Sequence, residues 1–140
     1  MNRLAITLSL LLWSLGAHAG VEISNAWARS TAPGQEVGAA YMSLKSTMAA
    51  KLLEVKSPIA ESVEIHEMSM NNGVMKMRML DVLDLPAGKT VKLEPGGFHL
   101  MLIDLKKPLR AGDAIEISMT FKDGRGKLIN QKVSLPVKAD

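Results

Sequence analysis

The sequence contains no cysteine and few aromatic residues. Its 140 residues include 2 Trp, 1 Tyr and 2 Phe. The absence of cysteine excludes disulfides, thiol redox chemistry, zinc–thiolate sites and cysteine nucleophiles. It also excludes the blue-copper type of electron-transfer site, which needs a cysteine thiolate. Because aromatic residues make up only 4% of the chain, aliphatic side chains and methionine must fill most of any core.

The first 19 residues have the composition of a secretory signal peptide. Arg3 is their only charged residue, and it is followed by an apolar run and by small residues that end at Ala19. This order predicts export to the periplasm and cleavage after Ala19, which leaves residues 20–140. The run is shorter than the roughly 20 apolar residues of a membrane span. Gly20 rather than a cysteine follows the predicted cleavage point, so we expect no stable membrane anchor.

The charge of the chain is small and scattered. Seventeen Lys and Arg residues against 14 Asp and Glu residues give a net charge of +3 at pH 7. Nucleic-acid-binding proteins carry clustered basic residues, and the sequence shows no such cluster. We therefore expect no nucleic-acid partner. The length after cleavage is that of a single domain, which we expect to be a monomer.

Turn-forming residues recur throughout residues 20–140. They separate short apolar or alternating runs, which leaves little room for helices. The runs predict strands at 21–29, 37–46, 51–57, 60–70, 74–82, 89–94, 97–104, 114–122 and 127–136. We therefore expect one all-β domain, an antiparallel β-sandwich or barrel, with Trp27, Tyr41 and Phe98 in its core.

Methionine is concentrated in one segment. Five of the ten methionines lie within residues 68–79. The dipeptide Asn72-Gly73 predicts a type I′ hairpin turn, which places Met68 opposite Met77 and His66 opposite Met79. One face of this hairpin then carries all the soft donors of the segment, namely His66, Met68, Met70, Met75, Met77 and Met79. A loop longer by one residue would turn the second strand over and separate the two sets.

A further pair of soft donors lies in the strand predicted at 97–104. His99 and Met101 are two residues apart, so they share one face of the strand at a spacing of about 7 Å. Imidazole and thioether ligands favour Cu(I) over zinc, calcium or magnesium, which prefer thiolate or carboxylate ligands. The pair is therefore a candidate two-donor binding site for Cu(I). Because all these ligands are neutral, the positive charge of the ion stays uncompensated. This should ease transfer of the ion to an acceptor site with more or stronger ligands.

Packing roles compete with this interpretation. A methionine in a strand more often fills a core, and a single histidine is more often a satisfied or surface residue than a ligand. Glu61, Glu64 and Glu67 fit a solvated edge, although they could also attract a cation. One pattern favours the interpretation as a metal site. His66 and His99 are the only histidines after the signal peptide, and each is followed two residues later by a methionine.

The spacing of four donors resembles a known signature. The order His66-x10-Met77-x21-His99-x-Met101 is similar to the H/M-x10-M-x21-H-x-M signature of the periplasmic PCu(A)C copper chaperones. The other segments that resemble this family are 26–29, 33–35, 39–42, 63–68, 73–78 and 95–102. The resemblance covers nearly the whole chain after the signal peptide.

The resemblance implies a cupredoxin-like β-sandwich that binds one Cu(I) ion at a shallow site. It implies His66, Met77, His99 and Met101 as the ligands. It also implies delivery of copper to the Cu(A) centre of cytochrome c oxidase subunit II, often alongside a Sco-type protein. Some relatives carry a C-terminal tail rich in His and Met, and residues 135–140 contain neither, so we expect no second site for Cu(II).

The residues favour a carrier over an enzyme. The sequence shows no nucleophile motif, and the only imidazoles available as bases after the signal peptide are the two proposed ligands. Two alternatives stay open. One is a periplasmic scavenger that buffers copper for tolerance or supplies other copper enzymes. The other is an extracytoplasmic β-sandwich interaction module that binds a partner peptide through its methionines, without metal.

Overall fold

The computed structural model describes residues 20–139, and the predicted signal peptide lies outside this range. The described residues form ten strands and no helix, which confirms the all-β prediction. No helix that could cross a membrane occurs among them. The strands are β1 (Val21–Arg29), β2 (Gly38–Ser46), β3 (Ala50–Lys56), β4 (Ala60–Asn71), β5 (Val74–Leu80), β6 (Leu83–Leu85), β7 (Thr90–Leu93), β8 (Phe98–Leu105), β9 (Ala114–Asp123) and β10 (Leu128–Lys138).

The sequence pattern missed one strand, β6. All nine predicted strands occur, and their ends differ from the prediction by two residues at most. β6 contains only three residues, with Leu83 and Leu85 buried and Asp84 exposed, and it pairs with the start of β3. Three residues are too few to show an alternating pattern, and the prediction extended the preceding strand to residue 82 instead.

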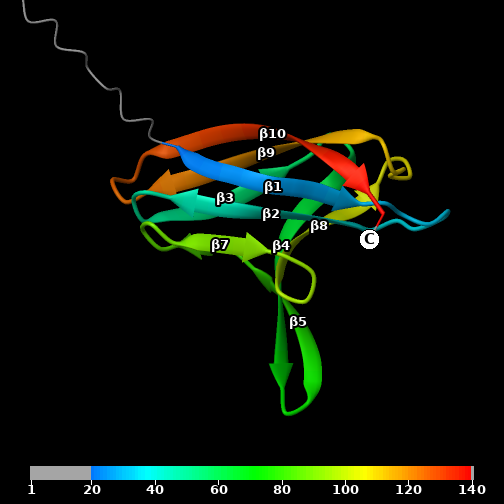
Figure 1. Cartoon of the computed structure of the whole chain (residues 1–140), viewed down its shortest axis with the longest axis horizontal. Coiled ribbons are helices and arrows are strands. Elements are labelled where there is room, and N and C mark those ends of the chain that lie inside the picture. Colours follow the sequence, from blue (N-terminus) through cyan, green and yellow to red (C-terminus); the bar gives the residue numbers. More distant parts are fainter. Residues whose placement is uncertain (1–19, 140) are drawn as a thin grey trace, which may run out of the picture.

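The strands form a sandwich of two layers (Figure 1). Their order is β5-β4-β8-β7-β2-β1-β10-β9-β3-β6, with a further pairing of β8 to β2. The pairings are antiparallel except for β1 with β10 and β7 with β8, which are parallel. The prediction of antiparallel pairing was therefore wrong for these two pairs. The β1–β10 pairing joins the first strand to the last and connects the two layers.

The core between the layers is mainly aliphatic, as the composition predicts. Its largest fully buried side chains are Met42, Leu44, Leu52, Leu85, Leu100, Leu102, Leu109, Ile117, Met119, Phe121 and Leu135. β9 shows the predicted alternation, because its four inward side chains from Ile115 to Phe121 are all buried. Phe121 contributes the one aromatic ring among these largest buried side chains.

The prediction that three aromatic residues lie in the core is confirmed for one of them. Tyr41 is buried, but Trp27 and Phe98 remain partly exposed. The Trp27 ring packs on the Tyr41 ring with centroids 4.8 Å apart, and the Arg29 guanidinium carbon lies 5.3 Å from the centre of the Tyr41 ring. Trp27 and Tyr41 lie opposite each other on β1 and β2, and β2 also pairs with β8.

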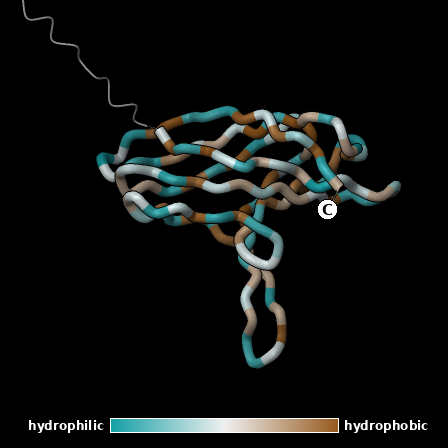
Figure 2. The backbone as a smooth tube through the Cα atoms, in the orientation of Figure 1, coloured by the Kyte–Doolittle hydropathy of each residue, from teal (hydrophilic) through white to brown (hydrophobic). Residues whose placement is uncertain are grey.

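The β4–β5 hairpin projects away from the body of the sandwich (Figure 1). β5 pairs only with β4, so it is an edge strand, and nearly all of its side chains are exposed. Asn72 and Gly73 have φ angles of 52° and 78°, the left-handed conformation that a type I′ turn requires at both positions. The predicted register is confirmed. Figure 2 shows that apolar and polar residues are mixed along this projecting hairpin.

Candidate metal centre

Three neighbouring strands bring the predicted ligands onto one face of the sheet. His66 of β4 lies opposite Met79 of β5 on one side and opposite His99 of β8 on the other. Directly opposed residues project from the same face. Met77 lies two residues from Met79, and Met101 lies two residues from His99, so both share this face as well. The strand order places all four predicted ligands on one side of the β5-β4-β8 sheet.

The two imidazoles lie close together. The ring centroids of His66 and His99 are 5.6 Å apart, and the ring planes are inclined by 42°. His99 is 8% exposed, and its Nδ1 lies 3.1 Å from the carbonyl oxygen of Gly97. A neutral imidazole that donates from Nδ1 keeps its lone pair on Nε2. Nε2 is therefore the nitrogen that His99 can offer to a metal ion.

His66 offers its other nitrogen. Its Nε2 lies 2.7 Å from a carboxylate oxygen of Glu64, so Nε2–H donates to Glu64 and the lone pair stays on Nδ1. Nδ1 is buried and has no hydrogen-bond partner among the described residues. A buried nitrogen without a partner is unfavourable, and a bound metal ion would supply the missing partner. Carboxylates commonly orient metal-binding histidines in this way.

The two predicted methionine ligands differ in exposure. Met101 is partly buried and lines a shallow groove with His99, whereas Met77 is 50% exposed on the edge strand β5. Met68 of β4 lies opposite Met77 and also lines the groove. The structure therefore brings His66, His99 and Met101 together and leaves Met77 at their outer side, with Met68 between Met77 and the groove.

Tyr41 and Arg29 also line this groove. Met101 lies opposite Ala39 of β2, and Tyr41 follows Ala39 at the second position on the same face of that strand. Tyr41 is buried, as predicted from the sequence, and it also lines the groove. Pro95 and Gly96 also line the groove.

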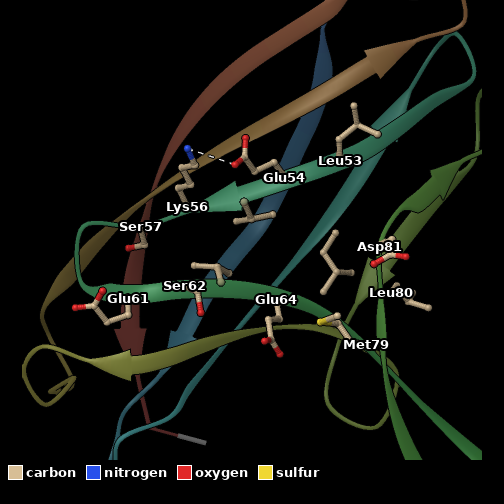
Figure 3. A pocket seen from close by; sticks show the side chains of 13 residues that line it. Leu53, Glu54, Lys56, Ser57, Glu61, Ser62, Glu64, Met79, Leu80 and Asp81 are labelled. Atoms are coloured by element: carbon tan, nitrogen blue, oxygen red, sulfur yellow. Dashed lines mark ion pairs between the residues drawn. The ribbon is translucent and has the colours of Figure 1, made fainter.

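The glutamates of β4 have specific partners, so the prediction of a solvated edge was wrong for two of the three. Glu64 binds His66, and Glu67 forms an ion pair with Arg78 at 2.8 Å on the opposite face of the hairpin. Glu61 is exposed. Figure 3 shows Glu64 near Met79, beside a groove between β3 and β4. The spacing Glu-x-His in a strand was the signal for the Glu64–His66 contact.

The donor set selects the type of ion. Within residues 20–139, no cluster of three or more His, Asp and Glu side chains could hold a metal ion. The further donors beside the two imidazoles on this face are methionine sulfurs. Thioethers are soft, neutral ligands that suit Cu(I) and disfavour calcium or magnesium.

The family of the chain follows from sequence comparison. Residues 21–137 match the family described as "Putative lipoprotein LpqE-like". A relative named "Putative lipoprotein Lxx21020", from Leifsonia xyli subsp. xyli, is 37% identical over 122 residues, 85% of this chain and 70% of that protein. Protein RP573 from Rickettsia prowazekii is 35% identical over 126 residues, 86% of this chain and 70% of that protein. The lipoprotein description agrees with an exported protein.

Solved structures have the same fold. Cu(I)-bound DR1885 from Deinococcus radiodurans is 32% identical, with a TM-score of 0.62 over 90% of this chain and 84% of that one. Its apo form gives 28% identity and a TM-score of 0.63 over 100% and 93%. The copper-bound PCuAC domain from PmoF2, at 24% identity, agrees in fold with a TM-score of 0.67 over 86% and 93%. This chain belongs to the LpqE-like family, the PCu(A)C family of copper chaperone domains that its His-Met spacing indicates.

Proposed function

We propose that this protein is a periplasmic chaperone that carries one Cu(I) ion on His66, Met77, His99 and Met101. The observation that carries the proposal is the pair of imidazoles, 5.6 Å apart, each with one nitrogen held by the protein and the other left for a metal ion. The likeness to Cu(I)-bound DR1885 at 32% identity supports copper as the cargo.

The site suits transfer rather than permanent storage. His99 and His66 are nearly buried and positioned by hydrogen bonds, so they hold the ion in place. Met77 is half exposed on an edge strand, so a donor from an acceptor protein can displace its sulfur first. The copper then leaves by stepwise ligand exchange. We infer a carrier and not an enzyme, because both imidazoles of residues 20–139 are assigned to the metal.

The ligand set is tested by X-ray absorption on the Cu(I)-loaded protein. Two sulfur and two nitrogen neighbours are expected around copper, because the four proposed ligands are two thioethers and two imidazoles. A spectrum without sulfur neighbours would refute the site. A spectrum with three sulfurs and one nitrogen would replace one proposed histidine by another methionine such as Met68.

We further propose that the copper goes to the Cu(A) site of cytochrome c oxidase subunit II, with a Sco-type protein as a second partner. Cells that lack the protein should show a selective loss of oxidase activity when copper is scarce, and added copper should restore it. A copper buffer for tolerance, the other function open to this site, would instead leave oxidase activity intact and lower survival in excess copper.

Glu64→Gln should weaken Cu(I) binding by about 10-fold or more, since loss of a carboxylate partner of a ligating histidine typically costs about 10–100-fold in metal affinity. Competition with a Cu(I) chelator measures the change. Glu61→Gln is the matched control, because Glu61 is an exposed glutamate of the same strand, three residues away. Equal effects of the two substitutions would show that Glu64 acts only through its charge and not by orienting His66.

A further inference from the structure

The β4–β5 hairpin exposes an unusual amount of apolar surface. Seven large hydrophobic side chains of the described residues are exposed, and five of them lie on this hairpin. Four of those five are methionines, with exposed fractions from 47% to 65%: Met70, Met75, Met77 and Met79. Soluble proteins rarely leave contiguous apolar surface uncovered without a function. This surface is therefore a candidate binding site.

The methionines are confined to one face of the hairpin. The register places Met70 opposite Met75 and Met68 opposite Met77. The opposite face carries charged and polar residues, with an ion pair between Glu67 and Arg78. Leucine or valine would give an equally apolar face, yet this one holds only methionine and His66. The feature to be explained is therefore the thioether sulfur and not apolarity alone.

The backbone brings the methionine side chains within reach of one another. Residues that flank a two-residue loop form a hydrogen-bonded pair, here Asn71 with Val74, and such pairs alternate with non-hydrogen-bonded pairs. Met70 with Met75, and Met68 with Met77, are therefore non-hydrogen-bonded pairs, whose Cα atoms lie about 4.5 Å apart. Methionine has three rotatable side-chain bonds, so sulfurs of adjacent pairs can meet at one point.

We propose that Met70, Met75 and Met77 form a second binding site for a soft monovalent ion at the free end of the hairpin. Three neutral thioethers select Cu(I) or Ag(I). None of the hairpin residues on this face between Met68 and Met77 is a carboxylate, so harder cations find no charged ligand there. The site is exposed and lacks imidazole, so it binds more weakly than the histidine centre.

Met77 belongs to both sites, and this sharing defines a path for the ion. From the hairpin end inward, the opposed pairs are Met70–Met75, then Met68–Met77, then Met79 and His66 beside His99. Successive pairs are about 7 Å apart. An ion bound at the free end can thus exchange one ligand at a time and reach the imidazoles while Met77 remains attached. This direction of travel rests on the proposed function, whereas the second site itself does not.

Titration with Ag(I) tests the site, because this ion is soft, monovalent and not oxidised in air. Protein labelled with ¹³C at the methionine methyl groups reports on each sulfur separately. The first equivalent should shift the signals of Met77 and Met101. A second equivalent should shift those of Met70 and Met75, with an affinity at least about tenfold weaker, because imidazole is absent there and Met77 is already bound to the first ion. This measurement needs no substitution and so does not depend on the folding of a variant.

Two variants separate the sites. His99→Ala with Met101→Leu should still bind one Ag(I) ion and shift the Met70 and Met75 signals, and adding Met70→Leu with Met75→Leu should abolish that uptake. Met48→Leu, remote beside Gly124, is the control and should change nothing.

The outcomes distinguish this inference from the proposed function. If a second equivalent leaves the Met70 and Met75 signals unchanged while the first shifts Met101, the second site is refuted and the histidine centre stands. If the Met70→Leu, Met75→Leu protein binds as many ions as the unmodified protein, the second site is likewise refuted. If Met70 and Met75 respond but Met101 never does, the hairpin site is supported and the proposed histidine centre fails.

Discussion

Replacement of His99 by Ala together with Met101 by Leu should weaken Cu(I) binding by more than about 100-fold. Loss of a residue that merely orients a ligating histidine costs about 10–100-fold, so loss of two ligands should cost more. His99 is also the more buried of the two imidazoles, and no other nitrogen donor on β8 can replace it. Competition with a Cu(I) chelator of known affinity measures the effect.

The matched control for this double variant is Met48→Leu, which removes one thioether far from the site. Its copper affinity should equal that of the unmodified protein. Circular dichroism in the β-sheet region and the unfolding midpoint should confirm that the double variant is folded. Unchanged copper uptake in a folded double variant would remove both residues from the ligand set. If the unmodified protein takes up no Cu(I) at all, the interaction module without metal becomes the better interpretation of the methionines.

Phe121→Ala should lower the free energy of unfolding by about 3–5 kcal/mol, the usual cost of truncating a fully buried phenylalanine. Phe121 has no exposed surface. It lies opposite Leu52 of β3 and Ile129 of β10, so its removal leaves a cavity where three strands of one layer meet. Urea denaturation followed by circular dichroism measures the change.

Leu128→Ala is the matched control for the core substitution. Leu128 lies at the start of β10, near Phe121, but is 58% exposed, so its truncation should change the free energy of unfolding by no more than about 0.5 kcal/mol. A loss below about 1 kcal/mol for Phe121→Ala would mean that the core collapses around the missing ring. The copper affinity of any Phe121→Ala protein that remains folded should be unchanged, because Phe121 lies in the other layer from the metal face.

Local features of the sequence determined the ligand-bearing hairpin. The dipeptide Asn72-Gly73 takes positive φ angles at both positions, which few other residue pairs tolerate, and a two-residue turn sets the register of the strands on either side. The pairing of Met68 with Met77 and of His66 with Met79 follows from that turn alone. Nine strands were likewise predictable, because alternation and turn residues act over a few positions.

The exposure of individual side chains was not predictable in the same way. Alternation along β4 places Glu64 on the face of His66 and Glu67 on the face of Arg78, but it does not show how far a neighbouring strand covers each side chain. The partial burial of Met68 and the exposure of Met77 depend on β8 covering one side of β4 while β5 has no strand beyond it.

The sequence by itself determined which donors the protein has, the face of the hairpin on which they lie, and the spacing that marks the family. Only the tertiary structure decided that β8 lies against β4, and so that His99 meets His66. It also decided that β1 runs parallel to β10 and that the short strand β6 joins β3. The physical reason is the separation in sequence over which each kind of interaction acts. Turn and alternation preferences act between neighbours in the chain, whereas strand order depends on the burial of apolar surface by segments that are far apart in sequence.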